Sequence, residues 1–533
     1  MRTKIASRRD SDDRARTDNG RTTRLSRRAA MAMSALGIVA LGRGTAMANS
    51  PDGQLTWAVH VSLAPTWFDP AETPGIITPF MIMYALHDAM VKPMPDSPAS
   101  PCLAEGWKAA PDGLSYEFKM RAGVKFHNGD AVTSEDVKFS FERYRGTSAA
   151  MIKGRVKAIE TPDAQTVRFV LKEPWPDFLT FYSSATGAGW IVPKKYVEKV
   201  GEEEFKKAPV GAGPYRFVSF TPGVELVMEA FDGYWRKKPS VKRIVFRVVP
   251  EEGTRLAALK RNEVDAAYSI RGELAEELRK SPGLALKSVV IQAPFWLYFA
   301  DQWDPKSPWH DQRVREAARL ALDYKAISEA LTLGFSPVTN SIIPDNFEYY
   351  WKPPAAVYNP AKAKQLLAAA GHGRGFDAGD YYCDTSYGNI AEVAINYLQE
   401  AGIRIKMRPL ERAAFFSSYS QKKLKNIIQG ASGAFGNAAT RLEAFVVKGG
   451  AYAYGNYPDI DELFAKQGTE LDVTKRTELL HRIQQIIHER SIYAPIWQLA
   501  FLNGVGKRVG EAGLGLIKGH AYSAPYEDVT IKK

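Results

Sequence analysis

The sequence predicts an α/β protein whose helices and strands pack in layers. After the first fifty residues, segments with strand-like alternation and segments with helical periodicity follow one another, and short, well-marked turns join them. No repeat at solenoid spacing and no low-complexity tract interrupts this order. The 533 residues are 45% hydrophobic and 24% charged, which is ordinary for a globular chain and enough for several domains.

Residues 1–48 have the pattern of an export signal. A basic run that ends in TTRLSRRAAMAM precedes a short Ala-rich apolar stretch and then GTAMANS, so we expect cleavage after Ala48. The SRR at 26–28 fits the twin-arginine route. Two alanines follow it in place of a large apolar residue, so the general route stays an equal alternative. The first cysteine is Cys102, which leaves no lipid-anchored cysteine after the signal. We expect a free periplasmic protein.

The charge of the chain is concentrated in this signal. The formal net charge is +12, of which residues 1–48 carry +7, so the remaining 485 residues carry only +5. Nucleic-acid binding therefore loses its main support. The two cysteines, Cys102 and Cys383, cannot form a disulfide framework or a zinc site. One long-range bridge is allowed in an oxidising compartment, and two free thiols are the expected state.

Several helices are marked by their ends. In YNPAKAKQLLAAAGHG, Asn359 is the expected N-cap, Pro360 the first helical residue and Gly371 the residue just past the end. The segment 388–410 predicts a helix that runs into a glycine and then a strand. Asp323 is the expected cap of the helix that follows DQRVREAARLAL.

The stretch GVKFHNGDAVTSEDVKFSFERY, residues 123–144, places a histidine near three acids and raises the question of a metal or acid–base site. The spacing favours a scaffold. Asn128-Gly129 is a strong hairpin turn signal after a strand that ends near Phe126, and Thr133 with Asp136 fits a capping box. Acids in a first helical turn are stabilised by the helix dipole. We therefore expect His127 to be structural.

No catalytic motif stands out elsewhere. The sequence has no G-x-S-x-G, H-E-x-x-H, Walker A or G-x-G-x-x-G pattern. Of eight scattered histidines, only His481 and His488 share a helix, and they are seven residues apart and expected on its solvated face. We expect no enzyme, no cofactor and no metal site. A secreted enzyme, the alternative class, would require a nucleophile–base pair that the sequence does not offer.

Aromatic residues are abundant: eleven Trp, 24 Tyr and 25 Phe. They are densest in TWAVHVSLAPTWFDP, GAGWIVP, IQAPFWLYFADQWD and YAPIWQLAFLNGV. Aromatic faces with a few polar groups are typical of solute clefts, although any single tryptophan more often fills a core.

Four motifs in order resemble the family 5 extracytoplasmic solute-binding proteins of ABC importers, the group with peptide- and nickel-binding members. They are PCLAEGWKAAPDGLSYEFKMRAGVKFHNGDAVTSEDVKFSFER, the segment from VGAGPYRF to EVDAAYS, DQRVREAARLALDYKAIS and YNPAKAKQLLAAAG. The resemblance extends from about residue 54 to about residue 509. It implies a two-lobed periplasmic binding protein of type II, in the large class with an extra subdomain, and with a hinge between its lobes.

The resemblance also implies a division of the chain. The expected segments are 1–48, the export signal; 49–88, the first part of lobe I; 89–206, an accessory subdomain; 207–297, the second part of lobe I; 298–496, lobe II; and 497–533, a return to lobe I. The crossings between lobes are expected near 292–299 and 493–498, which are rich in aromatic residues.

The solute is less well defined. Peptide-binding relatives commonly carry a Trp-Gly-Asp-type segment whose acid holds the α-amino group. Here Ala431 and Ala434 stand at the expected aromatic and acidic positions, and Asn437 replaces a following acid. This departure favours a neutral, anionic or modified-peptide solute over free-amino peptides. Opines, metal chelates and oligosaccharides remain alternatives. The residues expected to contact the solute are His60, Trp67, Trp190, Phe295, Trp296, Ser432, Phe435, Asn437, Arg441, Trp497 and Gln498.

The expected partners follow from the resemblance. They are a small-molecule solute and an inner-membrane ABC permease whose ATPase subunits are separate chains, which agrees with the missing phosphate loop. We expect a monomer that binds no nucleic acid. A periplasmic co-receptor that presents the solute-bound form to a sensor kinase is the remaining alternative, because it would use the same binding physics.

Overall fold

Ten strands form one sheet that connects segments far apart in the sequence. The computed structural model describes residues 53–72, 78–146, 149–183 and 186–532, within the unit that begins at Gly53. In spatial order the strands of the sheet are β10 (Tyr215–Thr221), β11 (Glu225–Ala230), β12 (Arg243–Val248), β1 (Gln54–Val59), β13 (Ala266–Ala267), β18 (Tyr493–Val505), β14 (Ala285–Phe299), β17 (Ile427–Ala431), β15 (Phe376–Asp384) and β16 (Ile403–Leu410).

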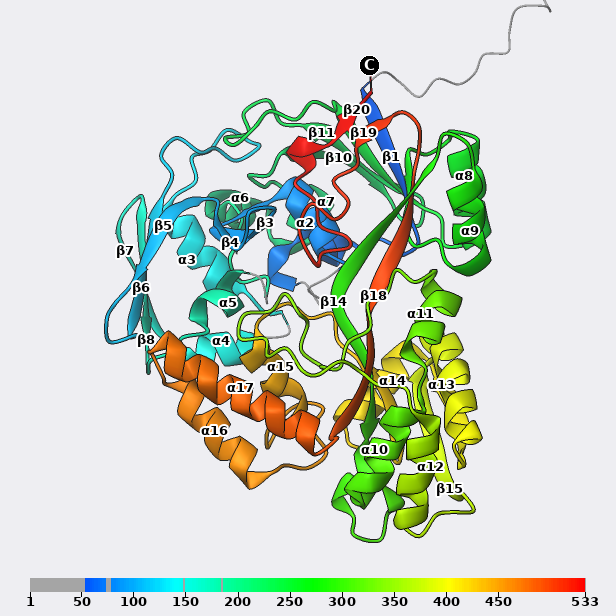
Figure 1. Ribbon diagram of the computed structural model, residues 1–533. Helices are drawn as coiled ribbons and strands as arrows, with labels where there is room; N and C mark the ends of the chain where they lie inside the picture. Colours follow the sequence, from blue (N-terminus) through cyan, green and yellow to red (C-terminus); the bar gives the residue numbers. More distant parts are fainter. Residues whose placement is uncertain (1–52, 73–77, 147–148, 184–185, 533) are drawn as a thin grey trace, which may run out of the picture. The chain divides into compact units, whose positions relative to one another are not determined.

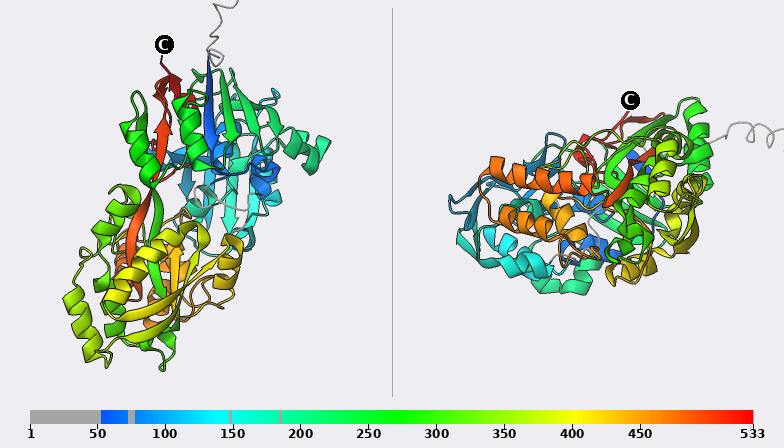
Figure 2. Two further views of the ribbon diagram at one scale, coloured as in Figure 1. Left: turned by 90° about the vertical axis from the view of Figure 1, so that its right-hand side faces the viewer. Right: turned by 60° about the horizontal axis from the view of Figure 1, so that its bottom comes forward.

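Two long strands join the two halves of this sheet. We call the half built on β10, β11, β12, β1 and β13 lobe I, and the half built on β17, β15 and β16 lobe II. β14 and β18 pair with each other in antiparallel register, and they run side by side from one half into the other (Figures 1 and 2). β1 is parallel to β12 and β13, and β15 is parallel to β16 and β17. The α/β, two-lobed architecture is thereby confirmed.

A second, antiparallel sheet forms what we call the accessory layer. Its strands, in order, are β5 (Ala104–Ala109), β6 (Ser115–Met120), β8 (Thr166–Leu171) and β7 (Val156–Asp163). Its helices are α3 (Ser134–Arg143), α4 (Ala149–Arg155) and α5 (Phe178–Ser183). The core between them is strongly aromatic: Phe118, Phe141, Phe169, Phe178 and Tyr182 are all buried. This layer therefore has an apolar core of its own.

Short elements complete lobe I and the accessory layer. The strands are β2 (Asp88–Ala89), β3 (Val91–Met94), β4 (Ser97–Pro101), β9 (Trp190–Ile191), β19 (Val509–Glu511) and β20 (Thr530–Ile531). The helices are α2 (Phe80–Leu86), α6 (Lys194–Val200), α7 (Glu202–Lys207), α8 (Glu252–Lys260) and α9 (Gly272–Lys280).

Eight helices cover lobe II and bury apolar side chains on both faces of its sheet. They are α10 (Gln312–Ala321), α11 (Tyr324–Thr332), α12 (Pro360–Ala369), α13 (Gly388–Glu400), α14 (Arg412–Ser420), α15 (Ala438–Phe445), α16 (Pro458–Gly468) and α17 (Val473–Glu489). One core includes Trp309 and Tyr381. The other includes Trp296 and Ile483. The continuous apolar runs of β14 and β17 reflect burial on both faces.

The predicted helix ends are confirmed. Asn359 accepts a hydrogen bond from the backbone N–H of Lys362 at 2.9 Å, and α12 begins at Pro360. Asp323 caps α11 by accepting from Ala326 N–H at 2.9 Å. The segment from Gly388 to Leu410 forms α13 and then β16, as its periodicity predicts.

The stretch around His127 is scaffold. The Asp136 carboxylate accepts hydrogen bonds from the backbone N–H and the hydroxyl of Thr133, both at 2.8 Å, at the start of α3. Both ring nitrogens of His127 lie against backbone: Nε2 is 2.9 Å from Gly213 O, and Nδ1 accepts from Gly211 N–H at 3.3 Å. The prediction of a strand that ends near Phe126 is wrong, because the backbone beside the turn forms only a single bridge, at Lys125.

Three further expectations concern the chain as a whole. The export signal, its cleavage site and its route lie outside the described residues. Cys102 and Cys383 are both free and both buried, in different cores. Within the described ranges, no helix is long and apolar enough to cross a membrane. The residue boundaries given above for the lobes stay a prediction.

Candidate functional site

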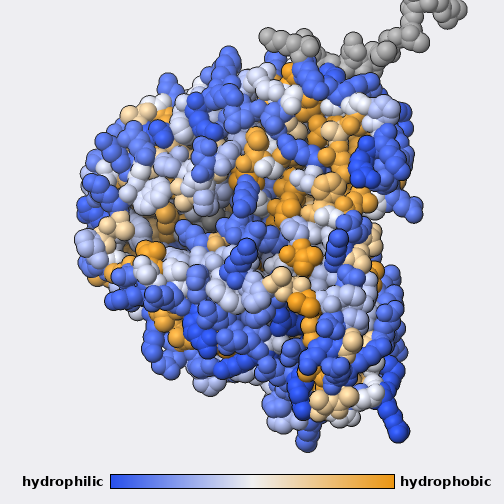
Figure 3. All heavy atoms as spheres, in the orientation of Figure 1, coloured by the Kyte–Doolittle hydropathy of each residue, from blue (hydrophilic) through white to orange (hydrophobic). Residues whose placement is uncertain are grey.

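The two long strands lose their regular pairing where they pass between the lobes. The register of β14 against β18 shifts between Val290 and Pro294, and Ile291 pairs instead with Gly519. Pro294 has no N–H to donate, and the N–H of Gln498 donates to Pro337 O at 2.9 Å. On the face drawn in Figure 3, apolar side chains gather over these two strands. This short, weakly paired stretch is the junction about which the lobes can turn.

A cavity of about 960 Å³, including the part open to solvent, lies beside this junction. Lobe I contributes Thr78, Phe501 and Tyr522, and the β14–β18 stretch contributes Ile291, Ala293, Phe295 and Leu499. Lobe II contributes Asp384, Tyr387, Phe415, Phe416, Gln429, Ala431, Ser432, Gly433, Phe445 and Tyr452. Because both lobes supply walls, a turn at the junction changes the size of this cavity.

Eight of the seventeen lining residues are aromatic. The Phe445 and Tyr452 rings are stacked, with centroids 4.9 Å apart and an interplanar angle of 18°. Phe295 meets Tyr387 edge to face at 4.9 Å. These mutual contacts fix the orientation of the rings before any solute enters, so the walls are preorganised apolar surfaces.

The polar side chains of the cavity are few. Gln429 already accepts from the Tyr381 hydroxyl at 2.9 Å and donates to Tyr387 O at 3.1 Å. Ser432 Oγ accepts from Ala434 N–H at 3.3 Å. Asp384 is the one charged residue among the lining side chains, and it is buried. It ends β15, a strand parallel to both of its neighbours, and ligand sites commonly lie at such carboxyl ends.

A second hollow of about 460 Å³ adjoins the cavity and shares Tyr387, Leu499 and Phe501 with it. It adds the exposed Arg271, which donates to Ser269 Oγ at 3.3 Å. The two hollows together therefore offer one carboxylate and one guanidinium, separated by apolar surface.

His60 lies behind the cavity wall and contacts Tyr522, which lines the cavity. Its Nε2 lies 3.1 Å from the hydroxyl of Tyr522, and the two rings are stacked at 5.7 Å. Burial, followed by the positive charges of Arg255 and Arg271, lowers the pKa of His60 to about 4. The imidazole is therefore neutral near pH 7.

Of the predicted contact residues, Phe295 and Ser432 line the cavity. Trp190, Trp296 and Trp497 are each at most 1% exposed and belong to three different cores. Trp497 also borders the adjoining hollow. Trp67 is half-buried against the core of lobe I. The three buried tryptophans illustrate the general rule that an aromatic residue more often fills a core than binds a ligand.

The remaining predicted residues lie next to the cavity or away from it. Phe435 is buried and stacks on His520 at 4.0 Å. Asn437 is the N-cap of α15, and Arg441 lies one turn further along that helix. Gln498 bonds to Asp345 through both of its amide atoms, at 2.9 and 3.2 Å, and lines a separate hollow beside Asp345.

Arg441 is not the solute-facing cation that the sequence allowed. It is 2% exposed, and its guanidinium donates to the carbonyl oxygens of Ile342, Gln292 and Ala434 at 3.0, 3.4 and 3.3 Å. Burial lowers its pKa to about 9, so the cation persists at neutral pH. Its charge faces backbone and not the cavity.

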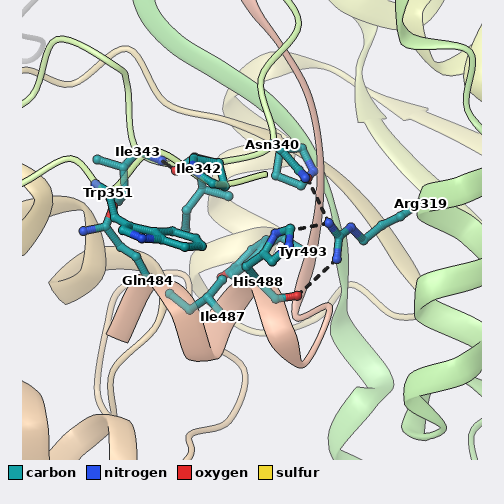
Figure 4. A pocket seen from close by; sticks show the side chains of 12 residues that line it. Arg319, Asn340, Ile342, Ile343, Trp351, Gln484, Ile487, His488 and Tyr493 are labelled. Carbon is teal, nitrogen blue, oxygen red and sulfur yellow. Dashed lines mark hydrogen bonds between the residues drawn. The ribbon is translucent and has the colours of Figure 1, made fainter. Parts of the chain in front are cut away.

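Another hollow, of about 350 Å³, lies wholly within lobe II (Figure 4). Arg319 donates there to Asn340 Oδ1 at 2.9 Å and lies 3.3 Å from His488 Nδ1, and Trp351 packs edge to face on His488. Burial and then Arg319 lower the pKa of His488 to about 4. His488 is thus packed, not on a solvated helix face as expected. No wall of this hollow comes from lobe I, so lobe motion cannot close it.

Sequence reasoning missed most of the lobe II wall. These residues are Phe415, Phe416, Phe445 and Tyr452, from α14, α15 and a loop, and none stands in the four aromatic-rich segments singled out from the sequence. Asp384 gave a usable signal, as the acid that ends the segment FDAGDYYCD just before the predicted helix at 388. Within the described residues, no group of three or more His, Cys, Asp or Glu side chains could hold a metal ion.

Comparison with known proteins gives consistent matches. The model for bacterial extracellular solute-binding proteins, family 5 Middle, matches residues 99–453. Probable di/tripeptide-binding protein 5 of Pseudomonas aeruginosa (strain UCBPP-PA14) is 27% identical over 435 residues, which cover 74% of this chain and 81% of that protein.

Solved structures match over both lobes. The binding protein AgaA of A. tumefaciens R10, in complex with agropinic acid, has a TM-score of 0.72 at 25% identity, covering 90% of this chain and 99% of that one. NikA of Brucella suis, in complex with Fe(III)-EDTA, has a TM-score of 0.78 at 21% identity, covering 90% and 100%. All three relatives are described as binding proteins or as complexes with a small molecule.

Proposed function

Since the chain belongs to the bacterial extracellular solute-binding proteins of family 5, we propose that it captures a peptide-like solute between its lobes. It would then deliver the solute to an ABC permease of the inner membrane. The observation that carries this proposal is the cavity whose walls come from both lobes and from the β14–β18 junction. A solute that touches both walls binds the closed form more tightly than the open form and so shifts the balance toward closure.

The aromatic walls favour a solute with apolar side groups. An aromatic side group of the solute that packs on such a ring contributes about 0.5–1.5 kcal/mol beyond the burial of apolar area. The stacked pair Phe445–Tyr452 and the edge-to-face pair Phe295–Tyr387 offer such faces on lobe II. Phe501 and Tyr522 offer them on lobe I. A di- or tripeptide with apolar side chains, or a modified peptide, fits this arrangement.

The charged residues of the site favour a solute whose binding depends more on its apolar groups than on a free amino group. The segment Ala431–Asn437 supplies no acid, and Asp384 is the one carboxylate on the wall. Arg271 stands in the adjoining hollow. We propose that these two residues orient the polar ends of the solute, while most of the affinity comes from the rings.

The proposed role is transport without chemistry. Family members are extracytoplasmic, and the export pattern of residues 1–48 supports a periplasmic location for this chain. The solute would be handed on unchanged to a permease that is driven by separate ATPase subunits. Turnover of any substrate by the isolated chain would contradict the proposal.

Two measurements test it. Mass spectrometry of the small molecule that co-purifies with the protein is expected to identify a peptide-like compound. Calorimetry then compares a panel of di- and tripeptides with their N-acetylated forms. We expect replacement of an apolar side chain by glycine to raise Kd more than acetylation does. Binding that requires a free amino terminus, or no binding of any peptide, would refute the proposed solute class.

A further inference from the structure

The side chain of Asp177 connects the accessory layer to lobe II. Asp177 precedes α5, is 7% exposed, and has both of its side-chain partners in lobe II. Oδ2 accepts from Nη2 of Arg476 at 2.6 Å, and Oδ1 accepts from Nδ2 of Asn437 at 2.5 Å. Figure 1 shows α17, which carries Arg476, beside the helices of the accessory layer. Among the described residues, this buried carboxylate thus takes its ion-pair and side-chain hydrogen-bond partners from the facing lobe.

Asn437 links this contact to the cavity. Its Oδ1 accepts from Thr440 N–H at 3.1 Å and caps α15, while its amide group donates to Asp177. The residues just before it, Ala431 to Gly433, line the cavity. One side chain therefore ends the solute-facing segment, starts the helix and reaches across to the accessory layer.

Besides its contact with Asp177, Arg476 is held in place by residues of its own lobe. Nε and Nη2 donate to Gln467 Oε1 at 3.1 and 3.0 Å, and Nη1 donates to the Tyr349 hydroxyl at 3.3 Å. The guanidinium also lies 4.9 Å from the centre of the Tyr349 ring. Because these contacts fix the guanidinium before Asp177 arrives, little conformational entropy is lost when the ion pair forms.

The three residues are themselves buried, with Asp177, Asn437 and Arg476 at 7%, 1% and 2% exposed, whereas the edge of the same interface is open to solvent. At the edge, Arg155 and Glu443 form a looser pair at 3.9 Å, with side chains 34% and 42% exposed. A buried pair that loses one partner is strongly destabilised, whereas an exposed pair contributes little.

We propose that Asp177, Asn437 and Arg476 form a closure latch, which sets solute affinity by stabilising the closed form without touching the solute. The latch exists only when the accessory layer meets lobe II. Loss of the latch interactions therefore shifts the equilibrium from the closed form to the open form. The apparent affinity for solute then decreases as the closed fraction decreases. This inference rests on the proposed function of solute capture by lobe closure.

The test compares Asp177→Ala and the near-isosteric Asp177→Asn with a control at the same interface, Arg155→Ala. Stopped-flow and calorimetry measure koff and Kd for the co-purified solute. We expect both Asp177 variants to raise koff and Kd at least about tenfold with little change in kon, since truncation of a buried charged partner acts mainly on dissociation. Arg155→Ala should stay within about twofold.

A second readout needs no solute. Dyes on Lys157→Cys in the accessory layer and Lys475→Cys in lobe II report the distance between the two sides. We expect both Asp177 variants to lengthen this distance in the solute-free protein. Because Asp177 and Arg476 are the two partners of one ion pair, the double variant Asp177→Asn/Arg476→Gln should lengthen this distance hardly more than Asp177→Asn alone.

The outcomes are distinct. Unchanged koff and unchanged distance in both Asp177 variants would overturn the latch, and so would a lowered Tm without any change in either. If the wild-type protein binds no peptide-like solute, the proposed solute class fails, while the distance measurement still decides whether the latch holds the lobes together.

Discussion

Nη2 of Arg441 lies 3.4 Å from the carbonyl oxygen of Gln292, the residue at which β14 passes between the lobes. The same guanidinium also holds Ile342 O, in the loop after α11, and Ala434 O, beside the cavity wall. One buried cation thus fixes three backbone segments that meet at the junction. Three aromatic rings, of Trp296, Phe347 and Phe445, lie within 6 Å of it.

Arg441→Met is expected to lower the free energy of unfolding by about 3–5 kcal/mol, because three buried carbonyls lose their donor. Arg441→Lys should lose less, since an ammonium keeps the charge but cannot span the three oxygens with a planar fork. Urea unfolding measures both. Equal losses in the two variants would mean that packing, and not the hydrogen-bond fork, is what Arg441 supplies.

Trp497→Ala is expected to behave as a core mutation. Trp497 is fully buried in lobe II, and Trp→Ala changes in cores cost about 3–5 kcal/mol. Thermal unfolding should show a clearly lowered Tm. A variant with unchanged Tm and weakened solute binding would instead restore the contact role that the sequence proposed.

Tyr452→Ala should weaken solute binding while leaving the fold intact. The ring is half-buried, lines the cavity and stacks on Phe445. Loss of one aromatic face is expected to raise Kd by about three- to tenfold. Tyr358→Ala, an exposed aromatic outside this cavity, is the matched control. Equal effects of the two variants would argue against an aromatic binding wall.

Acid should destabilise the protein through its buried histidines. Burial lowers the pKa of His87 and of His520 to about 4, from 6.5 in the unfolded chain. Between pH 6.5 and 4 these histidines are protonated in the unfolded chain but neutral in the native protein. The free energy of unfolding therefore decreases as pH falls. Each ring contributes at most about 1.4 kcal/mol per pH unit.

Urea unfolding at pH 7, 6 and 5 measures this slope. The variant His87→Gln keeps an amide donor for Phe68 O, which His87 Nε2 contacts at 2.9 Å, but cannot be protonated. It should therefore flatten the dependence of stability on pH. An unchanged slope would show that His87 does not titrate in this window.

The two thiols should be inert in the native protein. Burial, followed by the charge of Asp88, raises the pKa of Cys102 to about 12, and burial with Asp384 raises that of Cys383 to about 11. Reaction with a thiol reagent at pH 8 is expected only after denaturant is added. Ser432→Cys, on the cavity wall, is the positive control, and bound solute should protect it. Rapid labelling of the native wild-type chain would contradict this.

Local signals in the sequence were sufficient for the helix ends and for the fold class. Three helix starts are marked by Asn359, Asp323 and Thr133, each of which contacts a residue three positions further along. Whether these caps form therefore depends little on the rest of the chain. The isolated bridge at Lys125 shows where this fails, because a strand exists only if a partner strand comes alongside.

The site could be predicted only in part. Of the residues expected to contact the solute, Phe295 and Ser432 line the cavity, whereas Trp190, Trp296 and Trp497 fill cores. A tryptophan in a loop and one in a core have the same local sequence signal, since both need only apolar surroundings. Phe415 and Tyr452, which line the cavity, stand in short segments with other aromatic residues, but nothing in those segments distinguishes a cavity wall from a core.

The α/β class, the helix ends, the absence of recognised catalytic motifs and the resemblance to a solute-binding family could all be inferred from the amino-acid sequence. These depend on residue type and on spacing over a few turns. The folded structure was needed to show which aromatic residues face the cavity, that Arg441 binds backbone carbonyls, and that Asp177 meets Asn437 and Arg476. The contacts of Arg441 with Gln292 and of Asp177 with Asn437 and Arg476 join residues 149 to 299 positions apart, and such pairings depend on how the lobes pack and not on local spacing.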